Sequence, residues 1–596
     1  MDRNSVIGFV LIGVVLLVWM YYNTPKPSDI KKTTADTTEQ IQKSNIEKIQ
    51  AIPFPEEKPV VDTAGMFGKY FSAFKTGVEK VIIIETDNYT AEITTKGGLI
   101  RKWELKKYKT WDKHPVQLVD FDKGGDFSLL FNSSDGKLIN TRNLFFASNY
   151  KAWDKIVLQN DATFKVILNL SLEGNRRIEK HITFKNNSYS VEVDYKLIRL
   201  EPIIANYEYQ VIWENGIRYA EHNSADESRN AYAFAYSGGE LAELDATTED
   251  VSKTNISGKT DWVASRTKYF AVAIISKDQK STGAYLEGSH RKMPNHGLRE
   301  DYSIAMKMPY HDTRDSLASF ILFLGPLDYN ILKEYDVALE EVLSLGLAWL
   351  IRPISVYLII PLLEFLHSFI PNYGLVIIIF SIIIKLLLHP LTKASMKSMQ
   401  RMQALQPMIE EVRTKYKEDP QKMNQSIMRL YKEYGINPAG GCLPLLLQMP
   451  ILFALFTVFS SAIALRQANF IWWITDLSIP DTIVTLPFVI PMLGIQEVSG
   501  LALAMGITMF IQQKMTIKDP RQKMMVWLMP IMLTLLFNFF PSGLNLYYFM
   551  FNLLSIVQQI YVTKKHKNEP LRKVEPKKKG GGLIGKLSQN MPKLKK

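Results

Sequence analysis

Apolar and polar residues are distributed unevenly along the chain, and three patterns follow one another. Residues 6–22 are apolar without a break, residues 78–325 contain short apolar runs separated by turn signals, and long apolar runs return after residue 342. A helix of 17 residues, at about 1.5 Å per residue, covers most of a hydrocarbon core about 30 Å thick. The pattern therefore predicts an N-terminal membrane anchor, a polar middle region and a membrane core.

The N-terminal segment, residues 1–23, is predicted to be an uncleaved transmembrane anchor. It ends in Trp19, Tyr21 and Tyr22, and aromatic residues of this kind are typical of the membrane–water interface. A cleaved signal peptide is the alternative, but Asn23-Thr24-Pro25 does not resemble a small-residue cleavage site. Residues 24–77 are largely polar and begin with a Thr-, Lys- and Glu-rich stretch without periodicity, which predicts a flexible periplasmic tether.

The middle region, residues 78–330, is predicted to be a large all-β sandwich. Runs of β-branched and aromatic residues, such as 81–84 and 189–198, alternate with turn signals such as Lys96-Gly97-Gly98. Many strands at this spacing are typical of a sandwich. Glu221 and His222 have no spacing that separates a catalytic pair from a solvated surface. We therefore expect no catalytic residue, no metal site and no cofactor in this region.

The apolar runs after residue 342 predict five more transmembrane helices, which makes six with the anchor. They are bounded by Pro, Gly and charged residues, and they lie near residues 373–389, 441–464, 499–513, 524–540 and 544–562. The apolar stretch 353–370 carries Glu364 and His367 and could be a further span or an amphipathic helix in the interface. The stretch 482–497 contains Pro487 and Pro491, which predicts an extracytoplasmic hairpin or a re-entrant segment.

The charges of the connecting segments favour six spans. Residues 391–437 hold nine basic and five acidic residues, 514–523 hold four and one, and 563–596 hold twelve and two, whereas 466–498 hold one and three. Six spans put the three basic segments on one side of the membrane, as the positive-inside rule requires. Residues 331–370 are then an interfacial amphipathic region. Both termini and the basic tail, 563–596, are predicted to be cytoplasmic, and the β domain periplasmic.

Composition adds two exclusions. The single cysteine rules out a disulfide framework and a zinc site built from cysteines. Hydrophobic residues make up 47% and charged residues 22%, an average that looks globular only because the two halves of the chain differ. A soluble enzyme is therefore disfavoured, and we expect no enzymatic activity.

Lys385 is the first candidate for a functional residue because it lies inside the apolar run 376–388. An ionisable residue within a span costs roughly 2.5–3.5 kcal/mol on insertion scales, so it is by default a functional candidate. Snorkelling is equally open, since Pro390 lies only about 7–8 Å further along the helix axis. Other polar residues of the spans either join helices or line a wet cavity together with Lys385: Gln448, Gln513, Asn538, Asn545, Asn552, Gln558 and Gln559.

The basic segment 391–437 is predicted to form a cytoplasmic hairpin of two helices broken at residues 418–420. Its apolar positions are rich in methionine: Met396, Met399, Met402, Met408, Met423 and Met428. Flexible thioether surfaces suit varied apolar partners, although the same residues could simply pack the hairpin together. The basic tail could bind anionic lipid or RNA, or it could only set the topology.

Several motifs of the C-terminal half closely resemble the YidC/Oxa family of membrane protein insertases. They include Lys-Leu-Leu-Leu-His-Pro-Leu-Thr-Lys at 385–393, Met-Gln-Ala-Leu-Gln-Pro at 402–407 and Asn-Pro-Ala-Gly-Gly-Cys-Leu-Pro-Leu-Leu-Leu-Gln-Met-Pro at 437–450. Further matches, such as Phe-Pro-Ser-Gly at 540–543, follow in order, so that the resemblance covers about residues 345–564. The anchor and the large β domain resemble the Gram-negative form of the family by architecture.

The resemblance implies a five-helix insertase core, residues 371–562, that encloses a hydrophilic groove open to the cytosol and the bilayer. Family members usually carry Arg where this chain has Lys385, and the insertion at 482–497 is a second departure. Lys keeps the charge and loses the planar fork. Matching positions that line the groove or meet substrate, with Asn552 added from the polar set above, are Ser381, Gln448, Gln513, Tyr547 and Tyr548.

The implied function is to insert, fold and help assemble inner-membrane proteins, alone or with the Sec translocon. The implied partners are nascent membrane proteins, the Sec translocon with its accessory subunits, the ribosome at the basic loops and tail, and membrane lipids; neither nucleotide nor metal is required. A secondary transporter that uses Lys385 as an ion or substrate site is the alternative, and it predicts internal repeats that are not visible. A membrane-anchored carbohydrate sensor is a third possibility that rests on fold analogy alone.

Overall fold

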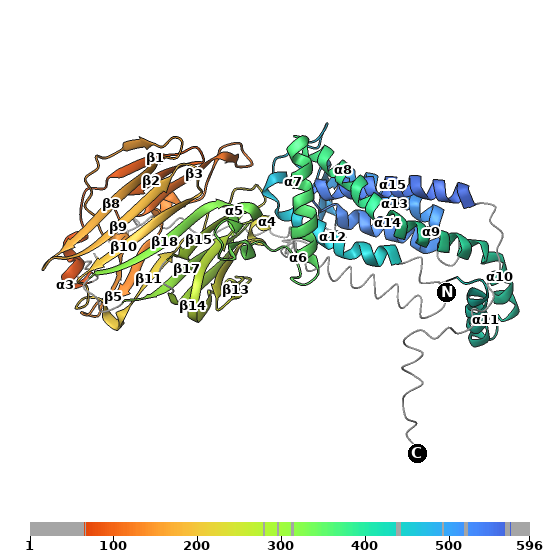
Figure 1. Ribbon diagram of the computed structural model, residues 1–596, viewed down its shortest axis with the longest axis horizontal. Coiled ribbons are helices and arrows are strands. Elements are labelled where there is room, and N and C mark those ends of the chain that lie inside the picture. Colours follow the sequence, from red (N-terminus) through yellow and green to blue (C-terminus); the bar gives the residue numbers. More distant parts are fainter. Residues whose placement is uncertain are drawn as a thin grey trace, which may run out of the picture. The chain divides into compact units, whose positions relative to one another are not determined.

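The computed structural model describes residues 65, 67–277, 281–294, 297–310, 315–436, 443–490, 494–517, 523–566 and 573. Two compact units meet in the sequence between Ser344 and Leu345 (Figure 1). The first unit is built mainly from strands, and the second is built mainly from helices. The predicted anchor, most of the tether and nearly all of the basic tail lie outside the described residues.

The strand unit contains one small sheet, in the order β4-β3-β2-β1-β7. Its strands are β1 (Val81–Glu85), β2 (Tyr89–Thr94), β3 (Ile100–Lys109), β4 (Pro115–Gln117) and β7 (Asp154–Val157). The pair β1–β7 is parallel, and the other pairs are antiparallel. Tyr89 on β2 stacks on Trp103 of β3 with ring centroids 3.8 Å apart, and both side chains are fully buried.

A larger sheet runs β6-β5-β11-β17-β16-β14-β15-β18-β10-β9-β8, with β12 on β14 and β13 on β12. Its strands are β5 (Ser128–Asn132), β6 (Leu138–Asn140), β8 (Thr163–Leu172), β9 (Arg176–Lys185), β10 (Ser190–Ile198), β11 (Glu208–Trp213), β12 (Tyr232–Ser237), β13 (Glu240–Leu244), β14 (Ser252–Arg266), β15 (Phe270–Ser276), β16 (Ser281–Lys292), β17 (Leu298–Pro309) and β18 (Asp315–Pro326). Every pair in this sheet is antiparallel.

Alternating burial along these strands accounts for the core. On β10, Val191, Val193, Tyr195 and Leu197 are buried and their neighbours are half-buried, which is the period of two expected of a strand with one covered face. Short helices α3 (Gly68–Phe71), α4 (Ser224–Ser228) and α5 (Tyr329–Lys333) lie between or beside the strands in sequence. The prediction of a β-sandwich for this region is confirmed.

The second unit begins with a continuous helical stretch made of α6 (Ile351–Ile354), the π-helix η7 (Ser355–Ile359) and α7 (Ile360–Phe369). The other helices are α8 (Tyr373–Leu387), α9 (His389–Ala404), α10 (Gln406–Lys415), α11 (Pro420–Glu433), α12 (Leu443–Ser461), α13 (Gly500–Thr516), α14 (Lys523–Phe537) and α15 (Ser542–His566). Helices α8, α12, α13, α14 and α15 occupy the five stretches predicted to be spans, with ends that differ by a few residues.

The number of six spans is not confirmed by the described helices. In the part of the chain that the structure describes, only Ile351–Phe369 is by itself long and apolar enough for a span, and α8 joins α9 at a 63° bend. Figure 1 shows α7 running across the direction shared by α8, α13, α14 and α15. The assignment of this stretch to the membrane surface therefore stays a prediction.

The basic segment contains three helices, α9, α10 and α11, and the prediction of two was wrong. The break at residues 418–420 is present, and Asp419 caps α11 by accepting a hydrogen bond from the Lys422 N–H at 3.0 Å. A second break falls at Leu405, because Pro407 lies in the first turn of α10 and cannot donate to the preceding helix. Leu405 and Ile409 form a small core with Tyr434 and Ile436.

Between α12 and α13 the chain forms a two-stranded antiparallel hairpin, β19 (Thr482–Ile490) and β20 (Ile495–Ser499). The sequence predicted a hairpin or a re-entrant segment here, and the hairpin is what the structure contains. Pro487 lies within β19, where a strand with a free edge tolerates the missing N–H donor.

Candidate functional site

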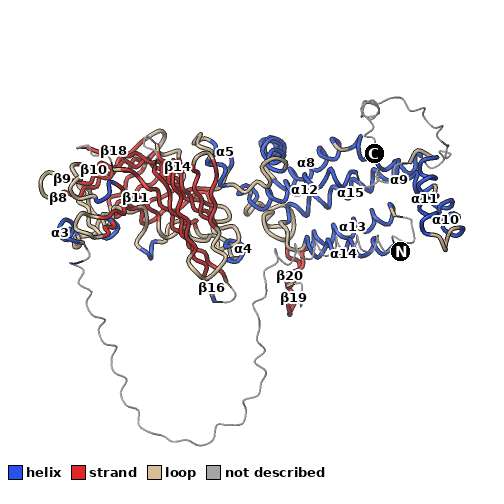
Figure 2. Tube along the Cα trace, turned by 90° about the horizontal axis from the view of Figure 1, so that it is seen from below, coloured by secondary structure: helices blue, strands red, loops and turns tan. Residues whose placement is uncertain are grey.

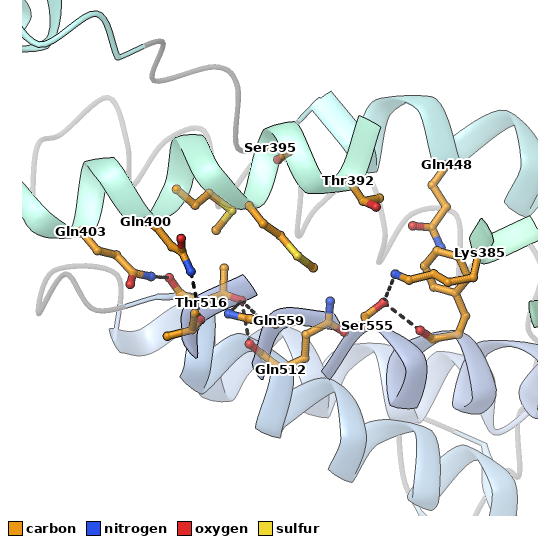
Figure 3. Close-up of a pocket in the computed structure, with 14 residues that line it drawn as sticks. Lys385, Thr392, Ser395, Gln400, Gln403, Gln448, Gln512, Thr516, Ser555 and Gln559 are labelled. Atoms are coloured by element: carbon orange, nitrogen blue, oxygen red, sulfur yellow. Dashed lines mark hydrogen bonds between the residues drawn. The ribbon is translucent and has the colours of Figure 1, made fainter. Parts of the chain in front are cut away.

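A cavity of about 210 Å³ lies among α8, α9, α12, α13 and α15 (Figure 3). Its lining combines one charged residue with hydroxyls, amides, methionines and one aromatic ring: Lys385, Thr392, Ser395, Met396, Met399, Gln400, Gln403, Gln448, Gln512, Thr516, Phe551, Ser555, Gln559 and Thr563. None of these described lining residues is acidic. The cavity therefore presents one positive charge within a neutral polar surface.

Lys385 is held by α15 from across the cavity. Its Nζ donates a 2.5 Å hydrogen bond to Ser555 Oγ, and Ser555 Oγ in turn donates to the carbonyl of Phe551 at 2.7 Å. The ammonium also lies 4.3 Å from the centroid of the Phe551 ring, a cation–π distance. The lysine is only 7% exposed, so its charge faces the cavity and these two side chains.

Uncharged polar groups continue from Lys385 along α9, α13 and α15. Gln403 Nε2 donates to the Thr516 carbonyl at 2.5 Å, and Gln559 Nε2 donates to Thr516 Oγ1 at 3.0 Å. Gln400 Nε2 donates to Thr563 Oγ1 at 3.1 Å. Figure 3 shows these side chains along the side of the cavity away from Lys385. Their amide and hydroxyl groups can readily exchange these hydrogen bonds for hydrogen bonds to water.

The bend between α8 and α9 is joined to α15 by a second set of polar contacts. Gln558 Nε2 lies 3.1 Å from His389 Nδ1 and donates to Thr392 Oγ1 at 3.0 Å. Pro390 lies in the first turn of α9, which leaves the bend without one backbone donor. The side-chain contacts hold α9 against α15 on the same side of the bend as the cavity.

The structure brings together five of the residues singled out in the sequence. Lys385, Gln448 and Gln559 line the cavity, and so do Met396 and Met399 of α9. Met402 instead packs against the small core around Leu405, and Met408 is exposed.

The other candidates lie outside the set of lining residues. Ser381 is fully buried and donates to the Ile377 carbonyl at 2.7 Å. Tyr547 and Tyr548 are buried with rings at right angles and 5.1 Å apart. Asn552 is buried, and its Nδ2 has no hydrogen-bond partner among the described residues. Gln513 is half-buried, while its neighbour Gln512 lines the cavity.

Sequence reasoning missed Ser555, which is the hydrogen-bond partner of the lysine. The available signal was a polar stripe on the last helix, in which Ser555, Gln559 and Thr563 recur every four residues. Gln559 belonged to the polar set noted in the sequence, but the serine and the threonine were not distinguished from ordinary residues of an apolar helix.

The strand unit contains buried acidic side chains. Glu300 accepts hydrogen bonds from Ser228 Oγ at 2.7 Å and Tyr302 Oη at 2.8 Å, and His290 Nδ1 lies 3.0 Å away. Burial raises the pKa of Glu300 above its ordinary value. His222 packs edge-on against Trp111. Within the described residues, no group of three or more His, Cys, Asp or Glu side chains could hold a metal ion.

Comparisons with known proteins cover nearly the whole chain. The family described as 60Kd inner membrane protein matches residues 365–569, and the YidC periplasmic domain matches residues 81–357. A protein of Chlorobaculum parvum named membrane protein insertase YidC is 40% identical over 569 residues, which are 94% of each chain. A protein of Chlorobium luteolum with the same name is 39% identical over 597 residues, 98% of this chain and 100% of that protein.

Among solved structures, one described as an active YidC insertase crystal structure with the first transmembrane domain resolved is similar to this chain. Its sequence is 20% identical, the match covers 84% of this chain and 96% of that one, and the TM-score is 0.34.

Proposed function

Because the chain belongs to the family of YidC membrane protein insertases, we propose that it inserts integral proteins into the inner membrane through the cavity around Lys385 and helps them fold and assemble. The observation that carries this proposal is a single ammonium group in a polar cavity between apolar helices. The cavity is the proposed groove, and α8, α12, α13, α14 and α15 are its five-helix core.

The physical task is to move a short polar segment of the substrate across the hydrocarbon. Unpaired amides and charges are prohibitively costly in such a medium. A cavity lined by amides and hydroxyls supplies temporary hydrogen-bond partners and shortens the apolar path. The apolar segment of the substrate then partitions into lipid, and this transfer supplies the driving force.

Lys385 attracts acidic ends of substrates by charge. An ammonium has three donors, and Ser555 accepts from one of them, which leaves two for a carboxylate. The position lacks the rigid fork of arginine, so recognition here needs charge and tolerates varied geometry. The hydrogen bond to Ser555 across the cavity favours a fixed role in this groove over snorkelling towards the end of α8.

The finer topology and partners are part of the same proposal. We infer that α9–α11 form a cytoplasmic hairpin, and that the basic loops and tail contact ribosomes while the Sec translocon shares some substrates. The stretch α6–α7 lies at the membrane surface, because it runs across the bundle and exposes Tyr357, Phe365 and Phe369. The strand unit is then periplasmic, and no catalytic chemistry is needed.

Protease protection in liposomes that contain only this protein tests the proposal. The substrate is a short single-span protein with an acidic terminal tail, and the proteins compared are the wild type, Lys385→Leu and Lys385→Arg. We expect insertion by the wild type and Lys385→Arg and little by Lys385→Leu. Equal insertion by all three folded proteins would show that insertion does not need the charge at position 385. Failure of all three would remove autonomous insertion.

A further inference from the structure

The hairpin β19–β20 carries apolar side chains that no other described part of its unit covers. Ile483, Val484, Phe488 and Val489 are each about half exposed or more. Successive residues of a strand point to opposite faces, so the neighbouring pairs Ile483–Val484 and Phe488–Val489 place apolar groups on both faces. Strand β19 contains no charged residue.

The hairpin is held firmly at its base. Asp481 is buried and accepts hydrogen bonds from Ser499 Oγ at 2.5 Å, the Leu501 N–H at 2.8 Å and Trp473 Nε1 at 3.0 Å. Directly after α14, the Asn538 side chain accepts from the Ser499 N–H at 2.9 Å and donates to the Glu497 carbonyl at 2.8 Å. The direction of the hairpin is therefore set by α13 and α14.

That direction leads away from the bundle at the end opposite α10 and α11. Figure 2 shows the hairpin projecting sideways from the helices, across the direction of α13 and α14. Its apolar surface continues onto α13, which begins at Gly500 directly after β20 and exposes Leu503, Ile507 and Ile511 along one stripe. A stripe of this kind on a membrane-spanning helix faces lipid.

Two tryptophan residues lie next to the base of the hairpin. Trp472 is 84% exposed and stacks on Trp473, which is the residue that donates to Asp481 at the base of the hairpin. Exposed tryptophan is typical of the membrane–water interface, where the ring is apolar and the indole N–H meets polar groups.

We propose that the β19–β20 hairpin lies in the outer interface of the bilayer, with its apolar side chains among the lipid headgroups and the upper acyl chains. This inference rests on the membrane location given in the proposed function, but not on the activity. Apolar groups on both faces suit a surrounding solvent better than a partner that covers one face. Pro487 also weakens the edge on which another strand would pair.

The backbone of the hairpin limits how deeply it can enter the bilayer. Among the described residues, β19 and β20 pair only with each other, so the outer edges of the hairpin keep unpaired N–H and C=O groups, which are not tolerated within the hydrocarbon core. At the headgroup level these groups bind water and phosphate esters while the side chains reach inward. The hairpin therefore extends the protein along the membrane surface without crossing it.

Site-directed fluorescence on the full-length protein in phosphatidylcholine vesicles tests this inference. Cys442 is the only native cysteine, so Phe488→Cys is made in a Cys442→Ser background and labelled with a polarity-sensitive dye. Lys417→Cys is the matched aqueous control, because it is exposed between α10 and α11 at the other end of the unit. Quenching is measured with iodide in water and with nitroxides attached near the lipid headgroup or deep in the chain.

We expect the Phe488→Cys label to be quenched by the shallow nitroxide and to be protected from iodide by about threefold or more relative to the Lys417→Cys label. Iodide quenching equal to that of the control, without nitroxide quenching, would overturn the proposal in favour of a hairpin in water. Protection from both quenchers would overturn it in favour of a hairpin buried against another part of the chain or a second copy of it. Both readouts are independent of insertion activity, so they separate this inference from the proposed function.

Discussion

Lys385 and Ser555 are 170 positions apart in the chain, and the ammonium of one donates a 2.5 Å hydrogen bond to the hydroxyl of the other. The bond joins α8 to α15 across the cavity and fixes where the only charge in the lining lies among the described residues. Serine is a neutral partner, so it orients the ammonium without cancelling its charge. A carboxylate at position 555 would have formed a closed ion pair and left little attraction for a substrate.

Replacing the serine tests whether the position of the charge matters as well as its presence. We expect Ser555→Ala to lower the rate of insertion of an acidic-tailed substrate by about threefold to tenfold, because a hydrogen bond to a charged group contributes about 1.5 kcal/mol or less at a partly hydrated site. The loss should be smaller than that of Lys385→Leu. Ser461→Ala is the control, since that hydroxyl donates to the Thr457 carbonyl within α12. Equal rates for both variants would contradict a positioning role.

The contacts at the bend should couple Gln558 to Thr392. Each single change, Gln558→Leu or Thr392→Val, removes one partner of a 3.0 Å hydrogen bond and should lower the unfolding free energy by about 1–2 kcal/mol. The double variant should lose less than the sum of the two, with a coupling of about 1 kcal/mol. Thermal unfolding of the detergent-solubilised protein provides the measurement. Strict additivity would show that the bend is held by packing alone.

Asp481 should be the most sensitive residue at the base of the hairpin. Asp481→Ala leaves the donors of Ser499, Leu501 and Trp473 without their acceptor in a buried place. We expect a loss of about 2–4 kcal/mol and faster proteolysis within residues 482–499. Glu497→Gln is the control, because this carboxylate is exposed and accepts from Thr482 Oγ1, and its change should cost at most about 0.5 kcal/mol. A similar loss for both variants would refute the buried acceptor role.

Glu85 should make the strand unit sensitive to acid. Hydrogen bonds from Lys106 at 2.8 Å and Lys155 at 2.6 Å lower the pKa of Glu85 from 4.5 to about 2. Because the folded pKa lies below the unfolded one, the carboxylate stabilises the fold above pH 4.5, and this contribution is lost as the pH falls towards 2. The pairs are partly exposed, so we expect only about 1 kcal/mol.

Chemical unfolding of a fragment spanning residues 65–344 measures this effect. Glu85→Gln should lower the unfolding free energy at pH 7 by about 1 kcal/mol and should have almost no effect at pH 2, and added salt should reduce the difference at pH 7. A difference of the same size at both pH values would mean that the substitution acts through packing and not through charge.

The sequence predicted the lysine of the cavity but not its surroundings, and the reason is physical. Lys385 stands out because an ionisable group in an apolar run carries a large cost, whereas Ser555 costs little in any helix and gives no such signal. Gln448, Met396 and Met399 were found through the family motifs and the methionine pattern. Gln400, Gln403 and Gln512 were missed, because an amide on a helix looks like an ordinary surface residue in the sequence. Only the packing of the helices shows that these three side chains face a common cavity.

For the fold as well, local features were predictable from the sequence, whereas contacts between distant segments were not. Strand periodicity and turn residues predicted the β-sandwich, and two prolines predicted the hairpin at β19–β20. The order of the large sheet was not predictable, because β11 pairs with β5 and β17, which lie far apart in sequence. The break at Leu405 has a visible cause in Pro407. It was not predicted, because the residues on both sides of the proline have the same helical pattern of polar and apolar positions.

The neutral lining of the cavity has a consequence for turnover. A polypeptide that exchanges hydrogen bonds between water and the glutamine and threonine side chains gains only about 1 kcal/mol or less per bond, since each new bond replaces one to solvent. Such a surface retains an incoming chain briefly and in no preferred register. If clients pass through this cavity as proposed, their dwell time depends on how quickly the apolar segment finds the lipid, and the release of one client before the next needs no chemical fuel.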